Sequence, residues 1–221
     1  MNEQNTPALS VTELGNPRRP QGEAGAAMLL NMNESHAAVT AWGLSFLDAE
    51  PQHCFLDIGC GGGAALHHMA GIITEGHLTG LDYSPVSVRT AAQINAAPIA
   101  AGRMEILEGS VSQMPFADGT FDRIITVESF YFWPSPQTDL REVRRVMKQS
   151  GRFLLIADIY GKDDLPESDL DNIRKYDLYN PTPETFRQLL ENAGFSQVQI
   201  HLMAGTTWIC AEGRGDTDAE G

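Results

Sequence analysis

The chain has 221 residues, which suits one α/β domain with short additions, and its 42% hydrophobic and 20% charged content is ordinary for a globular protein. Its net charge of −14 argues against nucleic acids and anionic membrane surfaces as partners, because both attract basic proteins. No apolar run approaches the ~18–20 residues of a membrane span, and the N-terminus lacks the apolar core of a signal peptide. We therefore expect a cytoplasmic protein with no membrane insertion.

The cysteine and histidine spacing predicts neither a disulfide framework nor a metal site. Cys54, Cys60 and Cys210 form no C-x-x-C pair, and an odd number of cysteines in an intracellular chain indicates reduced thiols. His67 and His68 are adjacent, which is poor spacing for two ligands on one helix face. We expect no bound metal.

The composition divides the chain into four parts. Residues 1–24 are rich in Asn, Pro, Gly and Glu and are predicted to be a mobile leader, and residues 212–221 a mobile acidic tail. Residues 25–50 carry helical patterns and are predicted to cap the domain, which spans 51–211. Within the domain, the polar connection 159–181 is long enough to serve as a lid over a ligand.

Short apolar runs alternate with amphipathic helical patterns along the domain. This alternation predicts a doubly wound α/β fold with a mostly parallel sheet and helices on both faces. The short Ala204–Gly205 connection predicts a hairpin and thus one antiparallel C-terminal strand. A ligand is expected beyond the carboxyl ends of the strands. The seven expected strands are 54–58, 77–81, 104–107, 123–127, 153–157, 198–203 and 206–211. The expected helices are 37–47, one that follows the glycine turn and runs through Met69, 85–99, 137–148 and one that begins at 183. Ser84, Thr182 and Gly151 are the start or stop signals.

The glycine-rich stretch Leu56–Ala64 lies between a predicted strand and a predicted helix. Glycines let the chain turn sharply there and let a ligand lie against bare backbone, beside the free amides of a helix N-terminus. Gly59, Gly61 and Ala64 also fit the dinucleotide fingerprint G-x-G-x-x-G/A, so the loop alone does not choose the cofactor. The alternative is that the glycines only form a tight turn between the strand and the helix and bind no ligand.

Asp82 strengthens the interpretation that the loop binds a nucleoside. It ends the second predicted strand, 19 residues after Gly63 (82 − 63), and an acid at about that spacing accepts hydrogen bonds from both ribose hydroxyls. Its alternative role is to cap the next helix. Both NAD and S-adenosylmethionine carry such a ribose, so an NAD-dependent oxidoreductase stays open at this point.

Three stretches together resemble the class I S-adenosylmethionine-dependent methyltransferases. They are Phe55–Ala64 with Asp82, then Gly109–Asp122, then Leu140–Gly151, and they run in the family's order over about half of the chain. The resemblance is to the branch of small-molecule and ubiquinone or menaquinone methyltransferases. It implies a Rossmann-like fold and in-line transfer of a methyl group from S-adenosylmethionine to a small-molecule acceptor, with S-adenosylhomocysteine as product. A binding protein without activity is the remaining alternative, and the subunit could be a monomer or a homodimer.

The resemblance also implies roles for matching residues. Asp57 and the backbone at Gly59, Cys60 and Gly61 would face the methionine part of the cofactor, and Asp82 its ribose. Relatives often carry Asp where this chain has Ser110, and a neutral acceptor for the adenine amino group should be weaker by roughly 1 kcal/mol. The remaining cofactor contacts implied are Asn33, Tyr83, Ser110, Val111, Glu128 and Ser129.

Three residues are candidates for a general base, which is needed only when the acceptor must lose a proton. His36 follows a segment that closes over the cofactor in some relatives, although Ser35 could simply cap a helix there. Glu128 and Tyr131 follow the fourth predicted strand. Tyr131 belongs to an aromatic cluster, residues 130–134, which we expect to line the acceptor pocket rather than only to pack beneath the next helix.

Overall fold

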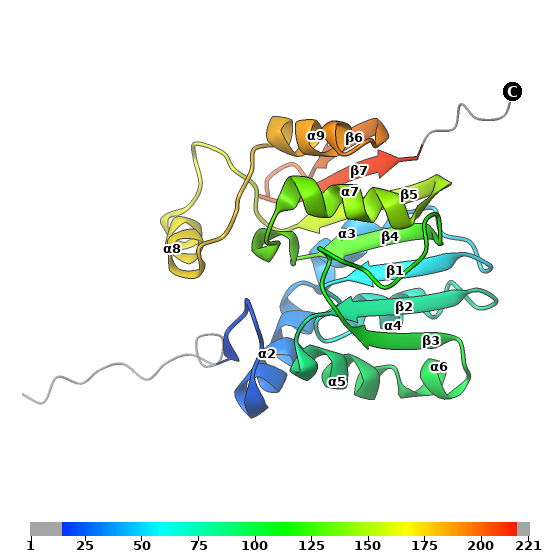
Figure 1. The fold of residues 1–221 in the computed structure, drawn as a ribbon. Helices are drawn as coiled ribbons and strands as arrows, with labels where there is room; N and C mark the ends of the chain where they lie inside the picture. Colours follow the sequence, from blue (N-terminus) through cyan, green and yellow to red (C-terminus); the bar gives the residue numbers. More distant parts are fainter. Residues whose placement is uncertain (1–14, 216–221) are drawn as a thin grey trace, which may run out of the picture.

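Residues 15–215 are described by the computed structural model, and they form a seven-stranded sheet of order β3-β2-β1-β4-β5-β7-β6 (Figure 1). Strands β1 to β5 pair in parallel, and β7 pairs antiparallel with both β5 and β6. The predicted fold class is therefore confirmed, including the hairpin. The strands are β1 (Cys54–Ile58), β2 (His77–Asp82), β3 (Met104–Glu108), β4 (Phe121–Val127), β5 (Met147–Ala157), β6 (Ser196–Leu202) and β7 (Ile209–Arg214).

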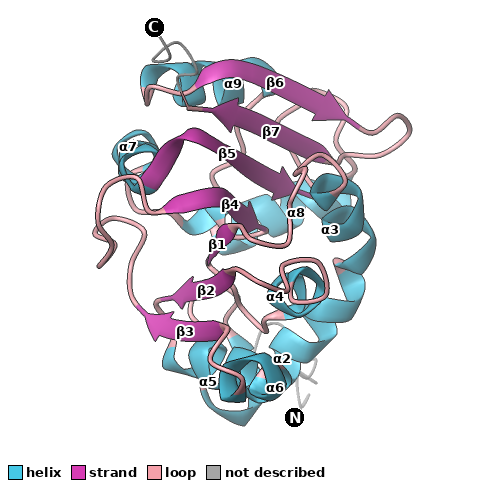
Figure 2. Cartoon of the chain, turned by 90° about the vertical axis from the view of Figure 1, so that its right-hand side faces the viewer, coloured by secondary structure: helices cyan, strands magenta, loops and turns pink. Residues whose placement is uncertain are grey.

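Helices cover both faces of the sheet, because the side chains of the central strands alternate between two apolar clusters. In β5, Phe153 and Leu155 face one cluster while Leu154 and Ile156 face the other. Figure 2 shows α3 and α4 on one side of the sheet and α7 and α9 on the other. The helices are α2 (Gly22–Ser35), α3 (Ala37–Leu44), α4 (Ala64–Met69), α5 (Pro85–Ile94), α6 (Ala96–Ala100), the 3-10 turn η1 (Phe130–Phe132), α7 (Pro136–Val146), α8 (Glu167–Tyr176) and α9 (Pro183–Asn192).

Several predicted element boundaries are wrong. Helix α3 ends at Leu44 rather than at 47, and β7 spans Ile209–Arg214 rather than 206–211. The helix expected to end at 148 with Gly151 as its stop ends at Val146, and β5 begins at Met147 because Met147 pairs with Phe121 of β4. The helix expected over 85–99 breaks at Asn95, whose side-chain amide donates to the carbonyls of Gly63 and Ala91. The caps at Ser84 and Thr182 are confirmed, since each side chain accepts a hydrogen bond from the amide three residues on.

The ends of the domain are more ordered than composition indicates. Helix α2 begins at Gly22, inside the expected leader, and β7 continues to Arg214, inside the expected tail. Residues 1–14 and 216–221 of these two segments lie outside the described residues. Ser35 ends α2 and does not cap α3, whose N-cap is His36. No helix within residues 15–215 is long and apolar enough to cross a membrane.

The polar connection after β5 contains one helix, α8, which stands apart from the main body. In Figure 1, α2 and α8 lie at the same end of the molecule as the carboxyl ends of β1, β2, β4 and β5. This is the sheet edge where α/β folds bind ligands.

Candidate active site

The glycine loop after β1 turns back over the end of β2. The amides of Gly59 and Cys60 donate to the carbonyl of Leu81, and Gly59 adopts a left-handed φ of 71°. A Cβ at Gly59 would collide with the side chain of Ser129. Glycine is therefore required there by conformation and by space, and the loop leaves its backbone open to a ligand.

Asp82 holds the loop from the neighbouring strand. Its side chain is buried and accepts hydrogen bonds from the amides of Gly61 (3.0 Å) and Ser84 (2.9 Å). Burial raises the pKa of this carboxyl, and those hydrogen bonds oppose the rise. The acid sits where the sequence predicts a ribose-binding group, between the glycine loop and the start of α5.

Asp57 carries an unsatisfied polar group in this region. Its carboxyl is 2% exposed, and Oδ1 is buried without a hydrogen-bond partner. Burial, reinforced by the nearby Asp82, raises its pKa to about 8. An unpaired buried oxygen costs stability, so this atom requires a donor from a ligand. The ammonium group of an amino acid would supply one.

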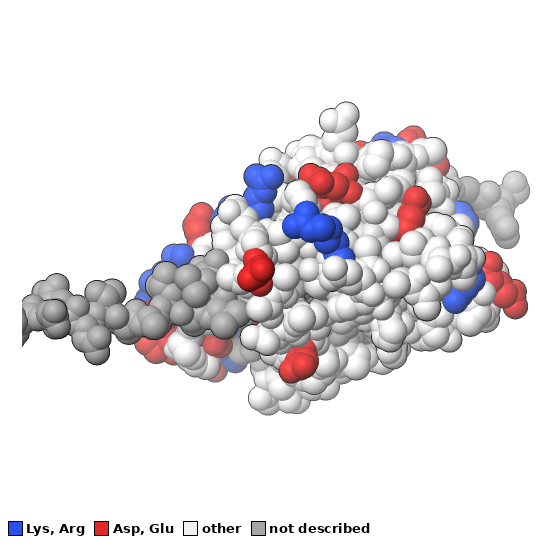
Figure 3. Space-filling model, turned by 90° about the horizontal axis from the view of Figure 1, so that it is seen from below, with Lys and Arg blue, Asp and Glu red and all other residues white. Residues whose placement is uncertain are grey.

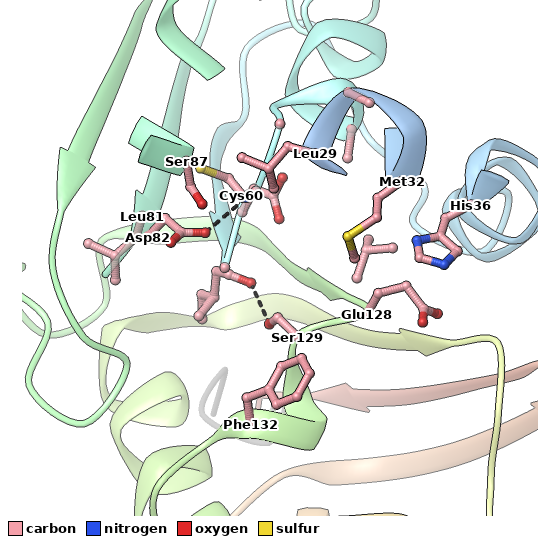
Figure 4. Close-up of a pocket in the computed structure, with 18 of the residues that line it drawn as sticks. Leu29, Met32, His36, Cys60, Leu81, Asp82, Ser87, Glu128, Ser129 and Phe132 are labelled. Carbon is pink, nitrogen blue, oxygen red and sulfur yellow. Dashed lines mark hydrogen bonds between the residues drawn. The ribbon is translucent and has the colours of Figure 1, made fainter. Parts of the chain in front are cut away.

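The loop and the two acids face a cavity of about 550 Å³, which is the size of a cofactor or drug-sized site. In Figure 4, Asp82 and Ser87 lie at one end of this cavity, and His36 and Glu128 lie at the other. The cavity brings together all of the predicted cofactor residues, which are Asn33, Asp57, Gly59, Cys60, Gly61, Asp82, Tyr83, Ser110, Val111, Glu128 and Ser129.

Helix α2 forms the cover of this cavity. Asn33 donates from Nδ2 to the carbonyl of Gly62 (3.3 Å), so the helix packs directly on the glycine loop. Leu29 and Met32 also line the cavity and were missed by sequence analysis, because an apolar helical position carries no signal that separates cofactor contact from core packing.

The predicted adenine side consists of Tyr83, Ser110 and Val111. Val111 is buried, whereas Tyr83 is 39% exposed and has the guanidinium of Arg19 at 5.9 Å from its ring centre. Ser110 accepts a hydrogen bond from the amide of Ser112 (3.2 Å) through its hydroxyl, which stays able to accept a second one.

The aromatic cluster after β4 divides between core and cavity. Phe130 is 2% exposed and packs against Phe186 with ring centres 5.5 Å apart, so it belongs to the core. Phe132 and Trp133 line the cavity. Trp133 donates from Nε1 to the hydroxyl of Ser129 (3.3 Å), which in turn donates to the carbonyl of Ile58 (3.1 Å).

A second cavity of about 430 Å³ adjoins the first and shares His36, Glu128 and Phe132 with it. Tyr131 lines this second cavity and not the first. Helix α8, within the predicted lid, contributes part of its wall. Further lining residues are Met32, Asp158, Asp169, Asn172, Lys175 and Tyr176.

The three predicted base candidates meet at the junction of the cavities, together with Asp158. Asp158 directly follows β5, and sequence analysis missed it, although a polar residue at the carboxyl end of a buried strand is a usable signal. Potential ligand atoms of His36, Glu128 and Asp158 lie within 4.8 Å of one another. Tyr131 approaches both acids through its hydroxyl, at 3.3 Å from Glu128 Oε2 and 3.1 Å from Asp158 Oδ1.

The pKa shifts of these groups run in different directions, so the groups can play different roles in proton transfer. Burial, and then the charge of Asp158, raise the pKa of Glu128 well above its usual range, and burial raises that of Tyr131. Both therefore hold their protons at neutral pH. Burial lowers the pKa of His36, although Asp158 opposes this effect with a carboxylate oxygen 3.9 Å from Nε2. A neutral imidazole beside a carboxylate is the member of this cluster best prepared to accept a proton.

Comparison with known proteins agrees with this geometry. A family model described as a methyltransferase domain matches residues 56–155. This part of the chain is similar to the class I S-adenosylmethionine-dependent methyltransferase domain. The chain is 29% identical over 153 residues to 2-methyl-6-phytyl-1,4-hydroquinone methyltransferase 1, chloroplastic, of Oryza sativa subsp. japonica, covering 69% of this chain and 44% of that one.

Two further matches show how much of the chain is similar to known methyltransferases. O-methyltransferase cnsE of Penicillium expansum is 26% identical over 162 residues, covering 72% of this chain and 57% of that one. The solved complex of the Haloferax volcanii Trm112 methyltransferase activator and a methyltransferase contains a chain with TM-score 0.74 and 19% identity, covering 87% of this chain and 96% of that chain. The chain thus spans about half of the curated relatives' length.

The cofactor of this methyltransferase family is S-adenosylmethionine. The residues present fit it: the unpaired oxygen of Asp57 requires a donor, and the cofactor carries an amino group. The glycine loop leaves room against its backbone, and Asp82 lies one loop away.

Proposed function

We propose that this protein transfers the methyl group of S-adenosylmethionine to a small-molecule acceptor. The observation that carries the proposal is the cavity at the carboxyl edge of the sheet, where the glycine loop, the unpaired Asp57 oxygen and Asp82 meet. When bound, S-adenosylmethionine supplies an activated methyl group on a sulfonium. The protein then has to orient the two reactants in line and exclude water.

The residues of the first cavity would hold the cofactor by complementary charge and hydrogen bonding. Asp57 would accept from the amino group and Asp82 from the ribose hydroxyls, while Ser110 and the amide of Val111 would meet the adenine edge. This arrangement would put the reacting end of the cofactor beside His36 and Glu128, which lie opposite Asp82 in Figure 4. The acceptor would then enter from the second cavity.

His36 would act as general base when the acceptor must lose a proton. Its lowered pKa keeps the imidazole neutral near pH 7, and Asp158 would stabilise the imidazolium that forms. Tyr131 and Glu128 would instead donate hydrogen bonds, because their raised pKa values keep them protonated. Replacing His36 by Ala should lower turnover and leave cofactor affinity little changed.

Calorimetric titration tests the cofactor assignment without any knowledge of the acceptor. Wild-type protein should bind S-adenosylmethionine and S-adenosylhomocysteine and not NAD. Asp82→Ala should lose roughly 1.5–3 kcal/mol of that binding, because buried hydrogen bonds to a charged group are removed. Glu108→Ala is the matched control, since Glu108 ends β3 directly opposite Asp82 in the strand register but is exposed and lies outside both cavities. Binding of NAD alone would overturn the proposal.

We also propose a cytoplasmic location, as a monomer or homodimer without nucleic-acid partners. Support comes from the cysteines, which are all free thiols, and from the net charge of −14. Burial raises the pKa of Cys60 and of Cys210, so these two thiols stay protonated and unreactive. Sedimentation at several protein concentrations distinguishes the two oligomeric states.

A further inference from the structure

We propose that the second cavity is the acceptor site and that its carboxylate end selects a cationic amine, which makes the reaction an N-methylation. This inference rests on the proposed methyl-transfer function and adds the substrate class. At about 430 Å³ the cavity suits a small organic molecule. Because it shares His36, Glu128 and Phe132 with the cofactor cavity, a group bound at that junction lies next to the reacting end of the cofactor.

The first argument is the number of hydrogen-bond acceptors at the junction. Glu128 and Asp158 are brought together by their strand ends, and Glu128 Oε1 already accepts from the amide of Asp158. The hydroxyl of Tyr131 lies within reach of both carboxyls but has only one hydrogen to donate. With Glu128 protonated, Asp158 is the carboxylate of this cluster, and a ligand that brings positive charge and several N–H groups would pair with it beside the neutral acid.

The second argument is the chemistry of the cavity walls. Asp169 adds a third carboxyl to the lining, and Phe132 and Tyr176 add aromatic rings. Each of these rings already has a cation of the chain over it: the Arg18 guanidinium is 5.5 Å from the centre of Phe132, and Lys175 Nζ is 5.4 Å from that of Tyr176. Carboxylates together with aromatic faces are a common environment for an ammonium group.

The same features disfavour an anionic acceptor. A carboxylate bound at the junction would meet the carboxylate of Asp158, and each of the two like charges disfavours the other. Two cations lie near this cavity: Arg18, which lines the first cavity, pairs with Asp177 at 3.7 Å, and Lys175, which lines the second, lies over Tyr176. A neutral alcohol would escape the repulsion but would gain no ion pair.

The proposed reaction balances with the residues present. The bound ammonium gives one proton to the neutral imidazole of His36, and Asp158 stabilises the resulting imidazolium from 3.9 Å. The freed nitrogen lone pair attacks the methyl carbon in line, and the sulfur–carbon bond breaks with its electron pair retained by sulfur. The products are the methylated ammonium and S-adenosylhomocysteine, and His36 returns its proton to solvent.

Three probes that share one ring and differ in charge test the selection. They are 2-phenylethylamine, 2-phenylethanol and phenylacetate, titrated by ligand-observed NMR into full-length protein saturated with S-adenosylhomocysteine at neutral pH. We expect the amine to bind at least about tenfold more tightly than the alcohol, and phenylacetate not to bind. Asp158→Asn should remove most of the preference for the amine, while Asp164→Asn, whose exposed side chain lies outside both cavities, should not.

The possible results of this experiment distinguish a failure of this inference from a failure of the proposed function. Asp158 lines only the second cavity, so Asp158→Asn should still bind S-adenosylhomocysteine as the wild type does. If that nucleoside binds and the amine does not, or if alcohol and amine bind equally, the N-methylation proposal is wrong while the cofactor assignment stands. The proposal also fails if Mn²⁺ binds wild type but not Asp158→Asn and excludes the amine, because the cluster would then be a metal site.

Discussion

At the scale of single residues, the most informative group is the carboxyl of Asp57. It is buried beneath the glycine loop with one oxygen unpaired, and its pKa rises from 3.8 to about 8. A group whose folded pKa is raised stabilises the fold fully below its unfolded pKa. That contribution is lost as pH rises toward the folded value, here between about pH 4 and 8. The unliganded protein therefore keeps an unpaired carboxyl oxygen where we propose that the cofactor's amino group binds.

We predict that Asp57→Asn stabilises the unliganded protein at pH 8 and weakens cofactor binding. The neutral amide avoids burying a charge, so its melting temperature should exceed that of the wild type by at least about 2 °C at pH 8 and the difference should shrink toward pH 5. Differential scanning fluorimetry over this pH range measures the difference, and calorimetry measures the loss of affinity.

Asp122→Asn provides a comparison of opposite sign. Burial raises the pKa of Asp122, but hydrogen bonds from Lys148 and the Cys54 amide outweigh it and lower the pKa overall. Removing this acid should lower the melting temperature at neutral pH. If Asp57→Asn behaves like Asp122→Asn, then Asp57 is satisfied in the unliganded protein and the argument for its amino-group partner fails.

Residue identities in this site could be predicted from sequence where a motif fixes the backbone. Asp57, Gly59 and Asp82 follow from the glycine loop and its spacing to the next strand, and the structure brings all three to one cavity. Asp158 and Met32 could not be found in the same way. Asp158 follows β5 and His36 follows α2, and these two elements are far apart in the sequence. The two side chains approach each other only through tertiary packing.

At the scale of elements, the segment 15–21 before α2 borders both cavities, because Pro17, Arg18 and Pro20 line the first and Pro17 also lines the second. At one end the carbonyl of Pro20 accepts from the hydroxyl of Ser84 at the start of α5 (2.8 Å). At the other end Arg18 donates to the carbonyls of Asp177 (3.0 Å) and Tyr176 (3.4 Å) at the C-terminus of α8. A cation at a helix C-terminus is favourable, so Arg18 ties this segment to α8.

We predict that Arg18→Ala loosens α8 more than any other element. The residue is about half exposed, so the lost contacts should amount to only about 0.5–1 kcal/mol, which corresponds to a two- to fivefold rise in amide exchange in α8. Hydrogen exchange read by mass spectrometry measures this. Arg19→Ala is the control, because Arg19 lies over Tyr83 on the cofactor side and should leave α8 unchanged. Equal effects of both variants would contradict a specific tie.

The element boundaries that sequence analysis missed have a common physical cause. The start of β5 at Met147 and the break at Asn95 are decided by partners far along the chain, Phe121 and Gly63 respectively. Local signals place the caps at Ser84 and Thr182 correctly, because a cap is satisfied within its own first turn.

At the scale of the whole molecule, alternation of strands and helices was enough to predict the sheet, its direction and its antiparallel end. The second cavity could not be predicted in this way, because its walls come from α2, η1, α8 and the end of β5, which meet only in the folded chain. The charge of the protein surface restricts only the broad class of partner. On the face shown in Figure 3, acidic and basic side chains are scattered among wide uncharged areas, and nothing on that face resembles a basic nucleic-acid surface.

The shared wall between the two cavities has a consequence for inhibitor design. Because His36, Glu128 and Phe132 border both spaces, one molecule can occupy both if an S-adenosylhomocysteine-like part is joined through its sulfur to an aminoalkyl part. Once the first part binds, a short linker holds the second at an effective concentration in the millimolar range. Such a tethered compound should bind more tightly than either half. The linker length that gives the best affinity would measure the distance between the two proposed binding sites.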